Sequence, residues 1–122
     1  MIVIRSATLA DVAGITRVHI ESWRSAYRGI VPQNILDGLS YAQRKHRWEE
    51  VLRRTARQEC VYVAENEAGE IVGFASGGRS LVRDEPLYRG ELFTIYILET
   101  YWRQGIGYRL FSQVVERFRA QI

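Results

Sequence analysis

Apolar positions recur with two different periods along this chain, and each change of period marks a new element. Residues 2–7 are rich in β-branched types and predict a first strand. From Thr8 onward apolar residues recur at helical spacing as far as Tyr27, and Gly29 marks the end of this helix. Thr8 with Asp11 resembles a capping box in which Asp takes the place of Glu, so the helix is expected to begin there.

Two further helices are predicted before the period changes. Pro32 suits the first turn of a short helix over residues 32–39. Ser40 and Gln43 offer a second capping box before a longer helix that runs to about Arg57. One side of this longer helix is basic, and we interpret it as a solvated, partly paired surface. The other side is apolar and consists of Trp48, Val51 and Leu52.

The second half of the chain begins with the two-residue period of strands. Residues 61–65 and 71–76 predict two strands joined by a short turn, which together form a hairpin. Residues 77–89 resemble a loop, and residues 91–97 predict a fourth strand. A last helix follows Gly105, because apolar residues again recur at helical spacing. These residues are Leu110, Phe111, Val114, Val115 and Phe118.

Length and composition agree with a single domain over residues 1–122, of which 47% are hydrophobic and 25% charged. Cys60 has no second cysteine to pair with, and with only His19 and His46 in the chain no metal site is expected. We therefore expect a reduced, cytoplasmic setting with Cys60 as a small buried residue, and no catalytic role for His19. No apolar run approaches the ~18 residues that span a bilayer, so no membrane segment is expected.

The charge balance is too small to demand nucleic-acid binding, which is a disfavoured alternative. The chain has 17 basic and 14 acidic residues, a net charge of +3 that is compatible with an anionic small ligand. Glu49 and Glu50 interrupt the basic helix over residues 44–57, and no aromatic platform accompanies it. Nucleic acid is therefore not an expected partner.

The segment Trp102-Arg103-Gln104-Gly105-Ile106-Gly107-Tyr108 lies between the fourth strand and the last helix. The first N–H groups of a helix lack partners and the helix dipole is positive there, so a pyrophosphate can bind. Gly105 and Gly107 would let phosphates approach without a Cβ in the way, although a tight turn that needs glycine for its geometry is the alternative. A dinucleotide fingerprint is excluded because position 110 is Leu, and the chain has no P-loop Gly-Lys-Ser or Gly-Lys-Thr.

The order of these elements and three motifs resemble the GNAT family of acetyl-CoA-dependent N-acetyltransferases. The segment from Tyr96 to Gly107 is similar to that family's cofactor motif, and Ile4-Arg5-Ser6-Ala7-Thr8 with Asp11 is similar to its usual start. Trp23-Arg24 with Ala26-Tyr27 and Gly29-Ile30-Val31-Pro32 resembles a large bacterial subgroup. The resemblance implies an α/β fold, a mixed and mainly antiparallel sheet flanked by helices, truncated after the third major helix.

The resemblance also implies acetyl-CoA as the co-substrate and a set of residues that contact it. Trp102 stands where the family pattern has Arg or Gln, so Arg103 is expected to assist the pyrophosphate in its place. Glu99 replaces a proline that is common after the fourth strand. The expected contacts are Tyr96, Ile97, Leu98, Arg103, Gln104, Gly105, Ile106, Gly107 and Tyr108.

Catalysis in the family implies a general base and an oxyanion site. Glu91 matches the position of a glutamate that removes a proton from the acceptor amine, with an ion-paired edge carboxylate as the alternative. N–H groups near Ile97, freed from the sheet by a bulge, are the implied oxyanion donors. Trp23, Tyr27 and Phe93 are expected to border the acceptor, although such aromatic residues, like Tyr96, are more often core.

We therefore expect transfer of an acetyl group from acetyl-CoA to a primary amine of a small molecule or peptide, or the CoA-binding part of such an enzyme. A non-catalytic CoA-binding or protein-interaction module is the alternative. Because the family continues with a fifth strand and a tyrosine acid, weak catalysis by these residues alone is expected. The fourth strand should then have an open edge that only Glu91 protects, with Leu110, Val114 and Phe118 uncovered beside it, which predicts self-association.

Overall fold

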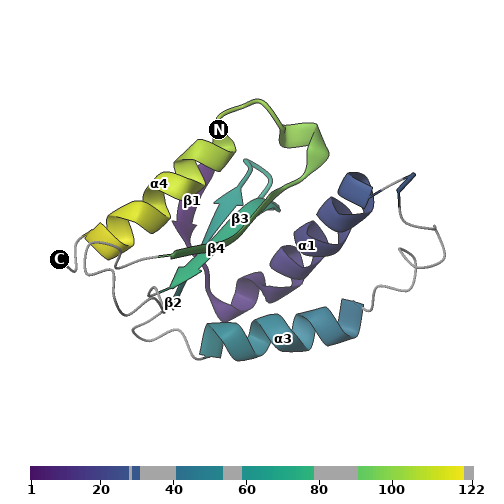
Figure 1. The fold of residues 1–122 in the computed structure, drawn as a ribbon, viewed down its shortest axis with the longest axis horizontal. Coiled ribbons are helices and arrows are strands. Elements are labelled where there is room, and N and C mark those ends of the chain that lie inside the picture. The colour runs from purple at the N-terminus through teal and green to yellow at the C-terminus, as the bar shows by residue number, and fades with distance from the viewer. Residues whose placement is uncertain (28, 31–40, 54–58, 79–90, 120–122) are drawn as a thin grey trace.

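The computed structural model describes residues 1–27, 29–30, 41–53, 59–78 and 91–119. Its sheet has four strands in the order β1-β2-β3-β4, and every neighbouring pair is antiparallel. Helices α1 and α3 cover one face of this sheet and α4 covers the other (Figure 1). The expected α/β fold with helices on both faces is confirmed. The strands are β1 (Val3–Ser6), β2 (Glu59–Glu65), β3 (Ile71–Gly78) and β4 (Glu91–Ile97), and the helices are α1 (Val12–Tyr27), α3 (Tyr41–Arg53) and α4 (Ile106–Arg119).

The start of α1 is tied to the sheet by an ionic cluster of Arg5, Asp11 and Glu65. A 3₁₀ turn, η1 (Leu9–Asp11), precedes α1, and the Asp11 carboxylate accepts the N–H of Thr8 at 2.8 Å, as the predicted capping box requires. Arg5 on β1 donates to both oxygens of Asp11 and to Glu65 on β2, each at 2.8 Å. The Arg5 guanidinium lowers the pKa of the Asp11 carboxyl.

The core between the sheet and the helices α1 and α3 follows the predicted apolar faces. Val12, Ile15 and Val18 of α1 are buried against Phe74 of β3 and Trp48 of α3. Val51 and Leu52 pack against the same cluster, so the predicted apolar side of α3 is confirmed. The opposite side of α3 is largely exposed and includes a contact at 3.0 Å between Nε2 of His46 and Oε1 of Glu50, as expected for a solvated, partly paired surface.

The core under α4 corrects one expectation. Leu110 is fully buried and Val114 is 3% exposed, because α4 lies against Val72 and other residues of β2 and β3. These two residues are therefore not an uncovered stripe. The large apolar residues left exposed on the described part of α4 are Tyr108 (76%), Phe111 (44%) and Val115 (42%). The side chain of Phe118 lies outside the described residues.

The hairpin differs from the prediction at one end. β3 extends through Gly77 and Gly78, which were expected in a loop, because both residues pair with β2 on one side and β4 on the other. Backbone pairing on two sides does not require side chains, so the local glycine signal is overridden. The predicted short helix over residues 32–39 and the remainder of the loop lie outside the described residues. None of the described helices is both long and apolar enough to cross a membrane.

Candidate cofactor site

The connection from β4 to α4 forms the predicted strand–turn–helix. Leu98 donates its N–H to the Val72 carbonyl at 2.9 Å, which continues the sheet beyond the end of β4, and a 3₁₀ turn, η2 (Glu99–Tyr101), follows. Helix α4 has its first helical hydrogen bond from the Arg109 N–H to the Gly105 carbonyl at 3.2 Å. Gly105 is thus the N-cap, and the N–H groups of the next three residues form the polar start of the helix.

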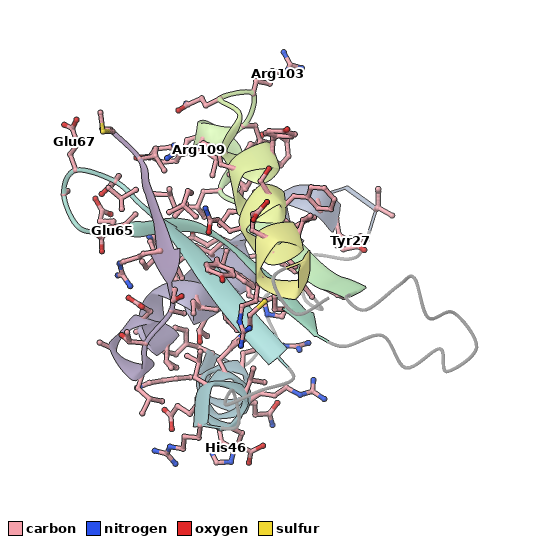
Figure 2. All side chains as sticks on the ribbon, turned by 90° about the vertical axis from the view of Figure 1, so that its left-hand side faces the viewer. Tyr27, His46, Glu65, Glu67, Arg103 and Arg109 are labelled. Carbon is pink, nitrogen blue, oxygen red and sulfur yellow. The ribbon has the colours of Figure 1, made fainter. Side chains whose placement is uncertain are left out.

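Two residues of this turn have a left-handed backbone conformation. Gly105 has φ +78° and Arg103 has φ +65°. The first value shows why glycine is needed at 105, because the turn requires a conformation that other residues rarely adopt. The left-handed conformation of Arg103 could not be predicted from the sequence, because arginine has no preference for it. Figure 2 shows Arg103 at the tip of the turn with its side chain directed away from the protein.

Gly107 has a different role from the one predicted. A Cβ at this position would lie 3.2 Å from Cδ1 of Ile97 and 3.9 Å from Cδ1 of Ile95. The missing side chain therefore faces β4, and glycine here allows the first turn of α4 to pack closely on the strand. The prediction that this glycine clears a path for phosphates is replaced by a packing role.

β4 has a free edge, because among the described strands it pairs only with β3. Since the Leu98 N–H points toward β3, the alternation of an antiparallel pair directs the N–H and C=O groups of Ile97 to the other side. The pairing is regular from Thr94 to Ile97, and the shift in register falls at Phe93. The expected bulge near Ile97 is therefore wrong: its polar groups point outward because β4 is an edge strand.

The edge is not entirely bare, which corrects the expectation that only Glu91 protects it. The indole N–H of Trp102 donates to the Ile97 carbonyl at 2.8 Å. Trp102 is 48% exposed, so its ring lies over the end of the strand from the solvent side. In the sequence, Trp102 stands out only as a departure from the family pattern. Nothing in the local sequence indicates that its side chain folds back onto β4.

Some of the predicted cofactor residues can offer a ligand only their backbone, whereas others expose their side chains. The side chain of Ile106 is buried in the core under α4, so only its backbone is available to a ligand. Tyr108 is 76% exposed in the first turn of α4, as a ligand-packing residue would be. Arg109 comes from the same turn (Figure 2) and donates to the Ile2 carbonyl at 2.9 Å, which fastens α4 to the first strand.

Tyr96 lies on the face of the sheet opposite to α4. Its ring stacks on His19 at 5.0 Å and contacts Phe74 at 5.7 Å, so its side chain belongs to the core under α1, as the alternative interpretation held. Trp48 donates its indole N–H to Nδ1 of His19 at 3.1 Å. Burial, with Arg44 and Arg47 nearby, lowers the pKa of His19 to about 4. His19 is thus a neutral packing residue at pH 7.

The predicted acceptor and base residues are only partly described. Trp23 and Tyr27 lie one turn apart on α1 with ring centroids 4.8 Å apart, and Tyr27 is 39% exposed. The side chains of Glu91 and Phe93 lie outside the described residues, although their backbone belongs to β4. Cys60 is buried, as expected, and its burial raises the pKa of the thiol.

A separate shallow hollow lies between the start of α1 and the β2–β3 turn. Two of its polar lining residues are already engaged: Asp11 binds Arg5, and Arg17 donates to the Ile71 carbonyl at 2.8 Å. No predicted site residue lines it. Over the part of the chain that the structure describes, no cluster of three or more His, Cys, Asp or Glu side chains could hold a metal ion.

The chain is similar to known proteins over nearly its whole length. Residues 18–121 match the sequence model of the acetyltransferase (GNAT) family. The chain is 36% identical over 116 residues to the uncharacterized N-acetyltransferase YuaI of Bacillus subtilis, covering 95% of this chain and 64% of that protein. The chain thus spans less than two thirds of the length of this relative.

Solved structures show the same fold. The PaiA N-acetyltransferase of Thermoplasma acidophilum in complex with coenzyme A superposes with a TM-score of 0.81 at 18% identity, covering 99% of this chain and 74% of that one. YncA of Salmonella typhimurium with acetyl-CoA superposes with a TM-score of 0.66 at 24% identity, covering 98% and 64%. The match of residues 18–121, the similarity to YuaI and the strand–turn–helix together confirm the resemblance seen in the sequence: the chain belongs to the GNAT family of acetyltransferases.

Proposed function

We propose that this chain forms the acetyl-CoA-binding part of an N-acetyltransferase that transfers the acetyl group to a primary amine. The observation that carries the proposal is the position of the α4 N-terminus beside the free edge of β4. Helix N–H groups there suit a pyrophosphate, and the outward carbonyl of Ile97 suits an N–H of the amide-bearing chain that follows the nucleotide. Acetyl-CoA, when bound, supplies the activated thioester.

Each part of the turn has a role in this proposal. The N–H groups of Ile106, Gly107 and Tyr108 bind the pyrophosphate, assisted by Gln104 and by the exposed guanidinium of Arg103. The exposed ring of Tyr108 packs against the ligand. Gly105 maintains the turn and Gly107 keeps α4 close to β4, so neither contributes a side-chain contact.

The reacting end of the site lies farther along the edge of β4. The outward N–H of Ile97 donates to the thioester oxygen, on which negative charge develops as the amine attacks. Glu91 takes the amine proton, and Trp23, Tyr27 and Phe93 border the amine, which belongs to a small molecule or a peptide. Leu98 packs against both core clusters and so positions the end of β4. We also propose a reducing, cytoplasmic setting, which agrees with the single buried Cys60.

The test uses a proline at the third helical position. Proline is tolerated in the first turn of a helix, so Tyr108→Pro removes both the ring and one N–H donor while the helix remains. Tyr108→Ala is the matched control that removes the ring alone. Calorimetry with CoA should show that the proline variant binds at least about 10-fold more weakly than the alanine variant, because a hydrogen bond to a charged group is lost.

Two outcomes would contradict the proposal. Equal affinity of the two variants would place the phosphates away from the α4 N-terminus. Absence of any heat of binding with the unmodified chain would remove acetyl-CoA as its ligand. Binding of CoA without thiol release in the presence of a range of primary amines, also in the longer protein, would favour the alternative of a non-catalytic CoA-binding module.

A further inference from the structure

Trp102 occupies a hydrogen-bond acceptor that the proposed ligand would also use. Its indole N–H lies 2.8 Å from the Ile97 carbonyl, and this carbonyl points away from β3 at the free edge of β4. The same edge adjoins the N-terminus of α4, which begins at Ile106. A ligand with phosphates on that N-terminus and a chain along β4 would meet the Ile97 carbonyl as an acceptor for an amide N–H.

The indole is in a position to leave this carbonyl at small cost. Trp102 is 48% exposed, and its hydrogen bond is an exposed, neutral one. Such a bond changes an equilibrium by only about 2- to 10-fold. The next residue, Arg103, has φ +65°, a conformation that residues other than glycine avoid, so the closed turn also holds some backbone strain.

We propose that Trp102 is a specificity-determining residue that guards the Ile97 carbonyl. In the free protein the indole N–H stands where an amide N–H of the ligand's chain would bind. Only a ligand with a chain along β4 has to displace the indole, so Trp102 lowers the affinity for a nucleotide joined to an amide-bearing chain and leaves the affinity for the nucleotide alone unchanged. This inference rests on the proposed function and names the part of the ligand that is recognised.

The experiment compares two probes and two variants. Coenzyme A carries the amide-bearing chain, whereas 3′-phospho-ADP carries the same phosphates without it. Trp102→Phe removes the N–H and keeps an aromatic ring. The matched control is Tyr101→Phe, which removes the hydroxyl that accepts from Asn66 at 3.1 Å in the same turn but does not touch the β4 edge.

Calorimetry should show that Trp102→Phe binds CoA about 2- to 10-fold more tightly than the unmodified chain, because no indole has to be displaced. Its affinity for 3′-phospho-ADP should be unchanged, and Tyr101→Phe should change neither affinity. The inference would be overturned if Trp102→Phe changed the affinities for both probes by the same factor. It would also be overturned if this variant bound CoA more weakly than the unmodified chain. In that case Trp102 is a packing contact for the nucleotide.

A spectroscopic measurement reports on the indole directly. The chain has three tryptophans, and the Trp102 indole N–H signal in a ¹H–¹⁵N spectrum is the one missing from Trp102→Phe. Saturating CoA should shift this signal and 3′-phospho-ADP should not, while the Trp48 signal, bonded to His19, serves as an internal reference. CoA binding with an unmoved Trp102 signal would refute only this inference. No CoA binding at all would refute the proposed function and the inference with it.

Discussion

Removing the charge of Asp11 should measure how strongly the ionic cluster of Arg5, Asp11 and Glu65 holds the first helix to the sheet. Asp11→Asn keeps an oxygen that accepts the Thr8 N–H but removes the negative charge that faces Arg5. The Asp11 side chain is only 8% exposed, and it receives two of the three 2.8 Å hydrogen bonds that Arg5 donates to carboxylates.

The expected loss follows from these contacts. Hydrogen bonds between charged groups contribute about 1.5–3 kcal/mol. The Arg5 side chain is 34% exposed and keeps Glu65 as a partner, so solvent screening brings the expected loss to the lower end of this range or just below it, about 1–2 kcal/mol. For a domain of this size the loss corresponds to a fall in Tm of roughly 3–10 °C. Urea unfolding followed by circular dichroism measures the change in free energy.

The pH dependence of the stability loss distinguishes a lost charge from a simple packing defect. The pKa of Asp11 is lowered in the folded protein by the Arg5 guanidinium, relative to an unfolded value of about 4. Its charge therefore stabilises the fold fully above pH ~4, and this contribution is lost as the pH falls through the lower folded pKa. The difference between the unmodified chain and Asp11→Asn should be constant from pH 6 to 8 and shrink in more acidic buffer.

The control is a carboxylate in an exposed pair. Glu67 contacts the amino terminus of Met1, and both side chains are largely exposed, so Glu67→Gln should leave the unfolding curve unchanged. If Asp11→Asn costs less than about 0.5 kcal/mol at neutral pH, the cluster contributes no more than an exposed surface pair. A cost that does not change with pH would mean that shape, not charge, is what Asp11 provides.

Three further results are expected. Gly105→Ala should destabilise the fold by about 1–2 kcal/mol because its φ is left-handed, whereas Gly107→Ala should destabilise it less, because its Cβ would press only on the end of the Ile97 side chain, at 3.2 Å; denaturation curves in the reverse order would contradict the two glycine roles. These 122 residues alone should release thiol from acetyl-CoA far more slowly than ~10 per second, and turnover at an ordinary enzyme rate would contradict this. The free edge of β4, together with the exposed Phe111 and Val115 of α4, should produce concentration-dependent self-association in sedimentation velocity, and a monomer at high concentration would refute it.

Local patterns in the sequence determined the elements and the start of the candidate site. The change from helical to two-residue spacing located the four strands and the main helices, because each period reports which residues of one element share a face. The turn from Trp102 to Tyr108 was found because glycines and a helix start follow an apolar strand directly. Burial of Cys60 and the cap at Asp11 likewise depend on residue type and short-range spacing.

Only the tertiary structure determines which residues pack against each face of these helices and strands. The missing Cβ of Gly107 faces β4, and Leu110 is covered by the sheet, because the position of α4 depends on strands distant in sequence. The outward direction of the Ile97 carbonyl follows from the register with β3, and register is set by pairing between segments that no local pattern relates. The contact of Trp102 with that carbonyl depends on both the register and the left-handed turn at Arg103, so periodicity within one element has no means of indicating it.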